Sequence, residues 1–210
     1  MKITLKDGSF KEYDQAMAAI DIAKDISEGL ARVACVAEVD GNVVDLRTII
    51  DKDCTLNILT FDSEEGKKAY RHTCAHVLAQ AVKNLYPDAK LTIGPAIDNG
   101  YYYDFDMESL DRAALDAIEK EMKKIIKKGD KLERFELSKE EAIELMTKRD
   151  EPYKVEMIKE HPDTDTLTFY QQGDFFFIVM GTNVIYTKAL KAFKITQQSG
   201  AYWKNDKENK

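Results

Sequence analysis

Residues 63–87 read SEEGKKAYRHTCAHVLAQAVKNLYP, and this stretch predicts a long helix at the centre of the fold. Ser63 can cap its start, the two glutamates that follow suit the positive end of the helix dipole, and Pro87 ends it. At 100° per residue, its apolar side chains fall within an arc of about 140°, which we expect to be the buried stripe. They are Tyr70, Cys74, Val77, Leu78, Ala81, Val82 and Leu85.

His72 and His76 lie four residues apart on this helix and share a face. Counted from Tyr70 they fall at about 200° and 240°, away from the apolar stripe, so we expect neither in the core. Two imidazoles one turn apart can hold one metal ion, or one water molecule between them. A pair of surface histidines would have the same spacing, so the residues alone leave both interpretations open. Cys74, on the stripe, is expected to pack.

The residues before this helix predict a small sheet with one helix packed across it. Residues 2–13 alternate apolar and polar around Asp7-Gly8, which favours a hairpin closed by a type I′ turn. A helix is expected from about Gln15 to Glu28, with Gly29 as the residue that ends it. Further strands are predicted at residues 33–39, 43–44 and 55–60, with a second turn at 40–41.

The residues after the central helix predict an α+β unit. Residues 108–128 form an amphipathic pattern that ends in the chain's basic cluster, for which we expect a solvated face rather than a binding site. A second helix should begin at Ser138, where Glu141 completes a capping box. The strands expected to complete the unit lie near residues 166–170, 174–180, 184–188 and 191–196.

The composition excludes several classes of protein. The 210 residues include 31 Lys and Arg against 38 Asp and Glu, a net charge of −7, which excludes a broadly basic nucleic-acid binder. No apolar run approaches the roughly 18 residues of a membrane helix, and the first residues carry no apolar leader. The three cysteines form no CxxC pair, so we expect no disulfide framework. These features predict a soluble, cytoplasmic protein.

Two sets of motifs resemble known domains. The segments ITLKDGS (3–9), SEGLARVACVAEVDG (27–41) and VVDL (43–46) resemble the TGS domain, a ubiquitin-like β-grasp module found on RNA-associated enzymes. Residues 71–106 resemble the editing domain of threonyl-tRNA synthetases, also called the second additional domain. Its further matches are PYKVEMI (152–158), YQQGDF (170–175), KAFK (191–194) and GAYW (200–203).

The resemblance therefore implies an α+β chain of two parts. A β-grasp (TGS) domain occupies residues 1–61, and a larger α+β editing-type domain occupies residues 62–210. We expect a structural role for the first part rather than strong RNA binding, because its acidic residues outnumber its basic ones.

The resemblance also implies an activity and its residues. Threonine and serine differ by one methyl group, worth only about 1–3 kcal/mol of discrimination, so the synthetase needs a second, hydrolytic site. In bacterial-type enzymes this domain hydrolyses the ester of mischarged seryl-tRNA(Thr). By resemblance, the catalytic residues are His72, His76 and Tyr103. The residues expected to contact substrate are Lys154, Gly94 and Pro95.

The chain departs from the family pattern at three polar positions. Phe177 stands where the family has an aspartate, Val179 replaces a cysteine and Asn183 a histidine. Two imidazoles are too few for a closed zinc site, so we assign no metal ligands beyond His72 and His76 as candidates. Without this carboxylate the site lacks a group that could orient water or act as a general base. General acid–base groups typically accelerate a reaction by about 10²–10⁴-fold.

Two functions follow from these departures: a weakened editing enzyme, or a catalytically silent structural or tRNA-binding module of the same fold. The apolar run at residues 175–180 indicates a buried strand in either case.

The parent protein is expected to be a synthetase of which this chain is the N-terminal fragment, unable to charge tRNA by itself. The N-terminal region of a bacterial nucleoside (uridine) kinase is the alternative. ATP, magnesium and zinc are expected only in the missing aminoacylation domain, with no cofactor here. The expected partners are the acceptor end of tRNA(Thr) and seryl-tRNA, with no membrane contact. The fragment should be monomeric and the parent a homodimer.

Overall fold

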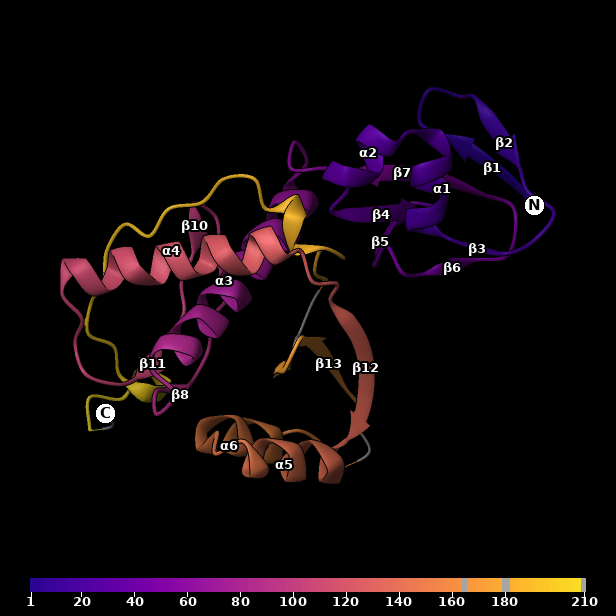
Figure 1. Ribbon diagram of the computed structural model, residues 1–210. Coiled ribbons are helices and arrows are strands. Elements are labelled where there is room, and N and C mark those ends of the chain that lie inside the picture. The colour runs from indigo at the N-terminus through magenta and orange to yellow at the C-terminus, as the bar shows by residue number, and fades with distance from the viewer. Residues whose placement is uncertain (164–165, 179–181, 209–210) are drawn as a thin grey trace.

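The computed structural model describes residues 1–163, 166–178 and 182–208 (Figure 1). An N-terminal module lies at one end of the molecule, and helix α3 (Glu64–Leu85) leads from it into a larger unit (Figure 1). As predicted, Ser63 caps this helix, because its side chain accepts a hydrogen bond from the Gly66 N–H at 3.0 Å. The central helix therefore begins where the N-terminal module ends.

The N-terminal module is built on a five-stranded sheet in the order β2-β1-β7-β4-β5, in which β1 and β7 are parallel and the other pairs antiparallel. Helix α1 (Ala19–Ile26) packs its buried face on this sheet, and α2 (Glu28–Val33) follows. The strands are β1 (Lys2–Leu5), β2 (Phe10–Glu12), β4 (Val36–Val39), β5 (Asn42–Val44) and β7 (Cys54–Leu59), with β3 (Met17–Ala18) paired to β6 (Ile49–Ile50) beside them.

The helix predicted from residue 15 begins later, at Ala19, because the two residues before it pair with β6. It also stops early, at Ser27, whose side chain accepts hydrogen bonds from the backbone N–H groups of Gly29 and Leu30 and so starts α2. The prediction that Gly29 ends the first helix is wrong, since Gly29 lies in the first turn of the second.

The two Asp-Gly pairs form different turns. Asp40 and Gly41 both have positive φ, 49° and 81°, as a type I′ turn between β4 and β5 requires. In the first hairpin Gly8 has a φ of 84°, whereas Asp7 has a negative φ. The predicted hairpin is confirmed there, but its type I′ turn is wrong.

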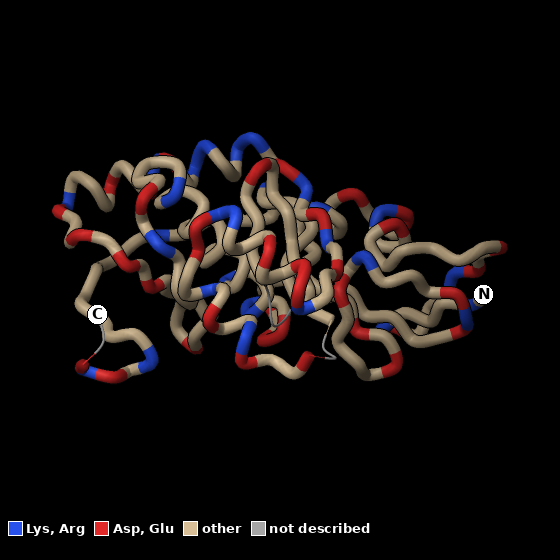
Figure 2. Tube along the Cα trace, turned by 90° about the horizontal axis from the view of Figure 1, so that it is seen from below, with Lys and Arg blue, Asp and Glu red and all other residues tan. Residues whose placement is uncertain are grey.

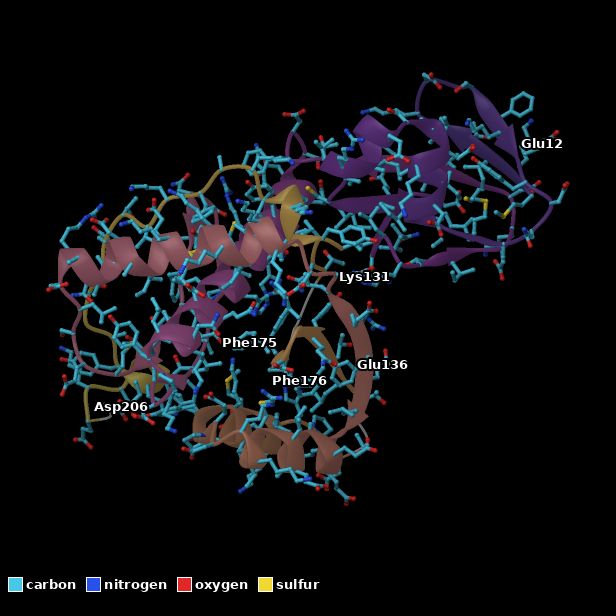
Figure 3. The ribbon with its side chains drawn as sticks, viewed as in Figure 1. Glu12, Lys131, Glu136, Phe175, Phe176 and Asp206 are labelled. Carbon is cyan, nitrogen blue, oxygen red and sulfur yellow. The ribbon has the colours of Figure 1, made fainter. Side chains whose placement is uncertain are left out.

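In the larger unit, α3 lies between the helix α4 (Arg112–Lys128) and the small sheet β12-β13-β14. Helix α4 packs along α3, and the sheet is covered on its other face by α5 (Lys139–Lys148) and α6 (Pro152–Lys159). Figure 3 shows neighbours on β14 directed to these two sides, Phe175 toward α3 and Phe176 toward α5 and α6. The remaining strands are β8 (Lys90–Leu91), β9 (Ala96–Ile97), β10 (Gly100–Tyr101), β11 (Phe105–Asp106), β12 (Glu133–Ser138), β13 (Thr166–Gln172) and β14 (Phe175–Ile178).

The capping box at Ser138 and the helix after it are confirmed. Two predicted strands are wrong: residues 184–188 form an isolated bridge from Tyr186 to Lys131 and a 3₁₀ turn, η1 (Thr187–Ala189), and residues 191–196 have no regular structure. A second 3₁₀ turn, η2 (Trp203–Asn205), lies near the end of the chain.

Residues 190–198 form an irregular strap, drawn in yellow along α4 (Figure 1). The Tyr70 hydroxyl of α3 donates to the Ala192 carbonyl at 2.8 Å and accepts from the Ala192 N–H at 2.9 Å. The Glu119 carboxylate of α4 accepts from the Ile195 N–H at 3.2 Å. Side chains of two helices thus bind backbone that the prediction assigned to a strand.

The two parts of the chain are joined by apolar packing of Val36 and Leu59 with α3 and also by polar contacts. The Tyr170 hydroxyl of β13 donates to the Asp45 carboxylate at 2.8 Å, and the Arg47 guanidinium lies 5.1 Å from the centre of the Tyr170 ring. Arg47 Nε donates to the Leu132 carbonyl at 3.1 Å. These contacts hold the N-terminal module against β13 and the residue just before β12.

Acidic and basic residues are intermixed along the trace (Figure 2). Three lysines of the predicted basic cluster on α4 have acidic partners: Lys123 with Glu119 at 3.1 Å, Lys124 with Glu121 at 3.3 Å and Lys128 with Asp130 at 2.9 Å. This pairing favours the solvated-face interpretation. No helix in the described residues is both long and apolar enough to cross a membrane.

Candidate functional site

Helix α3 is buried on the face that carries the histidines as well as on its apolar stripe. His76 is only 4% exposed, and Ala75 and Ala79 are fully buried, whereas Leu85 of the predicted stripe is 39% exposed. The prediction that the histidines lie outside the core is therefore wrong for His76. The reason is that α4 packs on one side of the helix while β14 and the segment around Tyr103 pack on the other.

The two imidazoles are neighbours, with ring centres 4.7 Å apart. A ring N–H of His72 donates to the Thr182 carbonyl, and this hydrogen bond partly offsets the burial that lowers the pKa of His72. Burial, the nearby His72 and the charge of Lys154 lower the pKa of His76 well below its usual value. Both ring nitrogens of His76 are buried without a hydrogen-bond partner. The pair is therefore neutral near pH 7 and offers imidazole lone pairs.

Phe177 covers His76. The two rings are stacked, with centres 4.0 Å apart and planes inclined by 19°, and Phe177 is only 2% exposed. The ring of Tyr170, which is paired with Phe177 across β13 and β14, also lies nearly parallel to it, with ring centres 5.8 Å apart. The predicted strand is confirmed for residues 175–178, while Val179 and the end of that apolar run lie outside the described residues. The position where the resemblance expects a carboxylate thus holds an aromatic ring in contact with an imidazole.

Lys154 and Tyr103 lie together beside the histidines. Lys154 is in the first turn of α6 and only 6% exposed, with its Nζ 5.5 Å from the centre of the Tyr103 ring. Burial lowers the pKa of Lys154 to about 8, and the charge of Glu151 offsets part of that fall. Burial also raises the pKa of Tyr103 above its usual value. A buried ammonium thus faces two neutral imidazoles and a phenol.

The backbone of Gly94 packs against the Tyr103 ring, and Pro95 follows it. A Cβ atom added to Gly94 would overlap the Tyr103 ring, so only glycine allows the backbone to approach it. The Pro95 carbonyl accepts from the Tyr102 N–H at 3.5 Å, which ties the two segments together. Both residues support the tyrosine in this structure, and direct contact with substrate stays a prediction.

Asn183 is fully buried and bound to α3. Its Oδ1 accepts from the Thr73 hydroxyl at 3.0 Å, and the Thr73 oxygen accepts from the Val184 N–H at 3.2 Å. The Asn183 Nδ2 has no hydrogen-bond partner. The amide that replaces the family histidine therefore packs under the site and leaves both N–H donors of its NH2 group unused.

The sequence reasoning missed two buried polar residues at this site. Gln172 is fully buried with neither side-chain atom hydrogen-bonded, and it lies on the same face of β13 as Tyr170, which stacks on Phe177. Glu151 is 4% exposed and precedes α6. Gln172 lies within the YQQGDF motif, but nothing in the sequence distinguishes it from an exposed strand residue.

In the described ranges, no group of three or more His, Cys, Asp or Glu side chains is arranged to hold a metal ion. The groups that converge are two neutral imidazoles, one ammonium and one phenol, with the amides of Asn183 and Gln172 beside them. Such a set can bind a polar, uncharged group and polarise a carbonyl.

Comparison with known proteins gives matches along the whole chain. Residues 1–60 match the TGS domain family. All of the chain aligns with threonine–tRNA ligases, at 56% identity for the enzyme of Acetivibrio thermocellus and 52% for those of Clostridioides difficile and Caldanaerobacter subterraneus. The chain spans about a third of the length of these relatives, 33% in each case. The chain thus has a TGS domain at residues 1–60 and is similar, over its whole length, to the N-terminal region of threonine–tRNA ligases.

Proposed function

We propose that residues 62–210 form an editing domain that binds the acceptor end of tRNA(Thr) and hydrolyses mischarged seryl-tRNA(Thr) slowly. The observation that carries the proposal is the approach of Lys154, Tyr103 and the two imidazoles to one another in a buried site. The similarity to threonine–tRNA ligases supports the choice of substrate.

In the proposed hydrolysis, the His72 imidazole acts as the base and the Lys154 ammonium stabilises negative charge. One nitrogen of His72 donates to the Thr182 carbonyl, so the other nitrogen of the neutral ring can accept a proton from water. The water oxygen attacks the ester carbonyl, and the Lys154 ammonium stabilises the oxyanion that forms. The ester C–O bond then breaks and releases serine, and the protonated His72 returns its proton to the leaving ribose oxygen.

The rate should be low because of Phe177. A carboxylate at that position could orient the imidazole or the water, and a phenyl ring stacked at 4.0 Å on His76 can do neither. The same contact favours a second candidate function, a catalytically silent module that retains tRNA binding.

Deacylation of serine-charged tRNA(Thr) by the purified chain tests the proposal, with threonine-charged tRNA(Thr) as the substrate control. Lys154→Ala should abolish the selective release of serine, whereas Lys148→Ala, on the exposed face of α5, should not. Phe177→Asp should raise the rate by about 10²-fold or more. Release of serine no faster than in buffer, for the native chain and for Phe177→Asp alike, would overturn hydrolysis; retained tRNA binding would then identify the silent module.

A further inference from the structure

We propose that Glu151 is a positioning residue for Lys154: it anchors the start of α6 to α3 and β8 and keeps the buried ammonium charged. The inference rests on the proposed function for the role of Lys154 in hydrolysis. The link between Glu151 and Lys154 rests on the contacts of Glu151 described below.

The Glu151 carboxylate joins three elements. One oxygen accepts a hydrogen bond from the Leu91 N–H of β8 at 2.8 Å, and the other forms an ion pair with Lys83 of α3 at 2.8 Å. The Glu151 backbone carbonyl accepts from the Val155 N–H at 3.1 Å and so begins α6. Lys154 lies in that same first turn. The direction in which Lys154 enters the site is therefore fixed through Glu151.

The ion pair between Glu151 and Lys83 is largely buried. The Glu151 side chain is 5% exposed and the Lys83 side chain 19%. Removing one partner of such a pair leaves an uncompensated buried charge, which is strongly unfavourable. Nearby Asp150 contrasts with it, because the side chain of Asp150 is 81% exposed although it also pairs with a lysine, Lys90. The structure thus distinguishes a buried acid from an exposed one at consecutive positions.

Lys154 needs a carboxylate because of its other charged and titratable neighbours. His72 and His76 face it from α3, and Tyr103 faces it from the segment after β10. None of these three groups carries a negative charge near neutral pH. Glu151 is the acid whose charge favours the protonated form of Lys154, against the burial that disfavours it.

The experiment measures the protonation of Lys154 directly. The chain is prepared with lysine labelled with ¹³C at Cε, the Lys154 resonance is assigned by its loss in Lys154→Arg, and its chemical shift is followed from pH 6 to 11. In the native chain the midpoint should lie near pH 8. Glu151→Gln keeps the acceptor for Leu91 but removes the charge, so the midpoint should fall by about one pH unit. Asp150→Asn is the matched control and should leave it unchanged.

For a second variant we expect a shift of the Lys154 titration midpoint in the opposite direction. Lys83→Met removes the cation that neutralises Glu151, so the carboxylate acts more strongly on Lys154 and the midpoint should rise. A merely structural role would shift the midpoint in the same direction for both variants, or not at all. Either result overturns the assignment, and Lys83→Met alone still decides it if Glu151→Gln does not fold.

Binding of a non-hydrolysable seryl-adenosine analogue separates this inference from the proposed function. If the Lys154 midpoints move as expected but the native chain does not bind the analogue, the positioning role stands and the proposed substrate is wrong. If the analogue binds but the midpoints do not move, Glu151 has no role in holding the charge.

Discussion

His76 should make the stability of the chain depend on pH, and the sign follows from its surroundings. Burial, with smaller contributions from His72 and Lys154, lowers the pKa of His76 well below 6.5 in the folded chain. In the unfolded chain the same imidazole titrates near pH 6.5. As the pH falls through 6.5, the unfolded state therefore binds a proton that the folded state does not, and the folded state loses stability.

The magnitude follows from this difference. An imidazole that stays neutral in the folded state costs about 1.4 kcal/mol of stability for each pH unit well below 6.5. Between pH 7 and pH 5 the loss amounts to about 2 kcal/mol. That is a large share of the roughly 5–15 kcal/mol by which small domains are stable. His76→Leu should remove this loss, so on acidification the variant should lose about 2 kcal/mol less than the native chain.

Urea unfolding followed by circular dichroism at pH 7, 6 and 5 measures the difference. The matched control is Gln80→Leu, one helical turn further along α3, where a buried amide oxygen also lacks a partner. Gln80 does not titrate in this range, so its variant should keep the full pH dependence of the native chain. Equal losses for His76→Leu and the native chain between pH 7 and pH 5 would refute the reasoning that His76 is neutral and buried.

Three further substitutions test other contacts. Tyr170→Phe removes the hydrogen bond to the Asp45 carboxylate and should cost about 1.5–3 kcal/mol in urea unfolding; no loss would mean that the two parts do not depend on this bond. Gly94→Ala should displace the Tyr103 ring and lower the melting temperature, and an unchanged melting temperature would contradict the close approach. Gln172→Leu replaces an unpaired buried amide, so urea unfolding should show a gain of about 1–3 kcal/mol; a loss would show that the amide has a partner.

Local signals in the sequence predicted most elements of the fold. Ser63 and Ser138 cap helices where expected, because an N-cap depends on a few adjacent residues. The break at Ser27 was missed, because the apolar spacing continues across it and only the side-chain bonds reveal the second helix. The prediction of a strand at residues 191–196, within the strap, is wrong because the partners of this backbone are side chains more than seventy residues away.

The candidate site was predicted through the resemblance rather than through residue patterns. Helical angles placed His76 away from the core, because they describe one stripe and cannot anticipate that β14 would cover the opposite face. Lys154 in isolation would be interpreted as a solvated side chain, yet it is 6% exposed. Glu151 carries no local signal at all, since its partners come from α3 and β8.

The bond between Tyr70 and Ala192 has a consequence for synthesis on the ribosome. Its two residues are 122 positions apart. At about 5–20 residues per second, α3 is made roughly 6–25 seconds before the backbone that its tyrosine binds. During that interval the apolar side chains of α3 have no complete partner surface. The nascent chain therefore leaves the part of α3 around Tyr70 without its backbone partner, and open to chaperones or to other chains, until Ala192 has been translated.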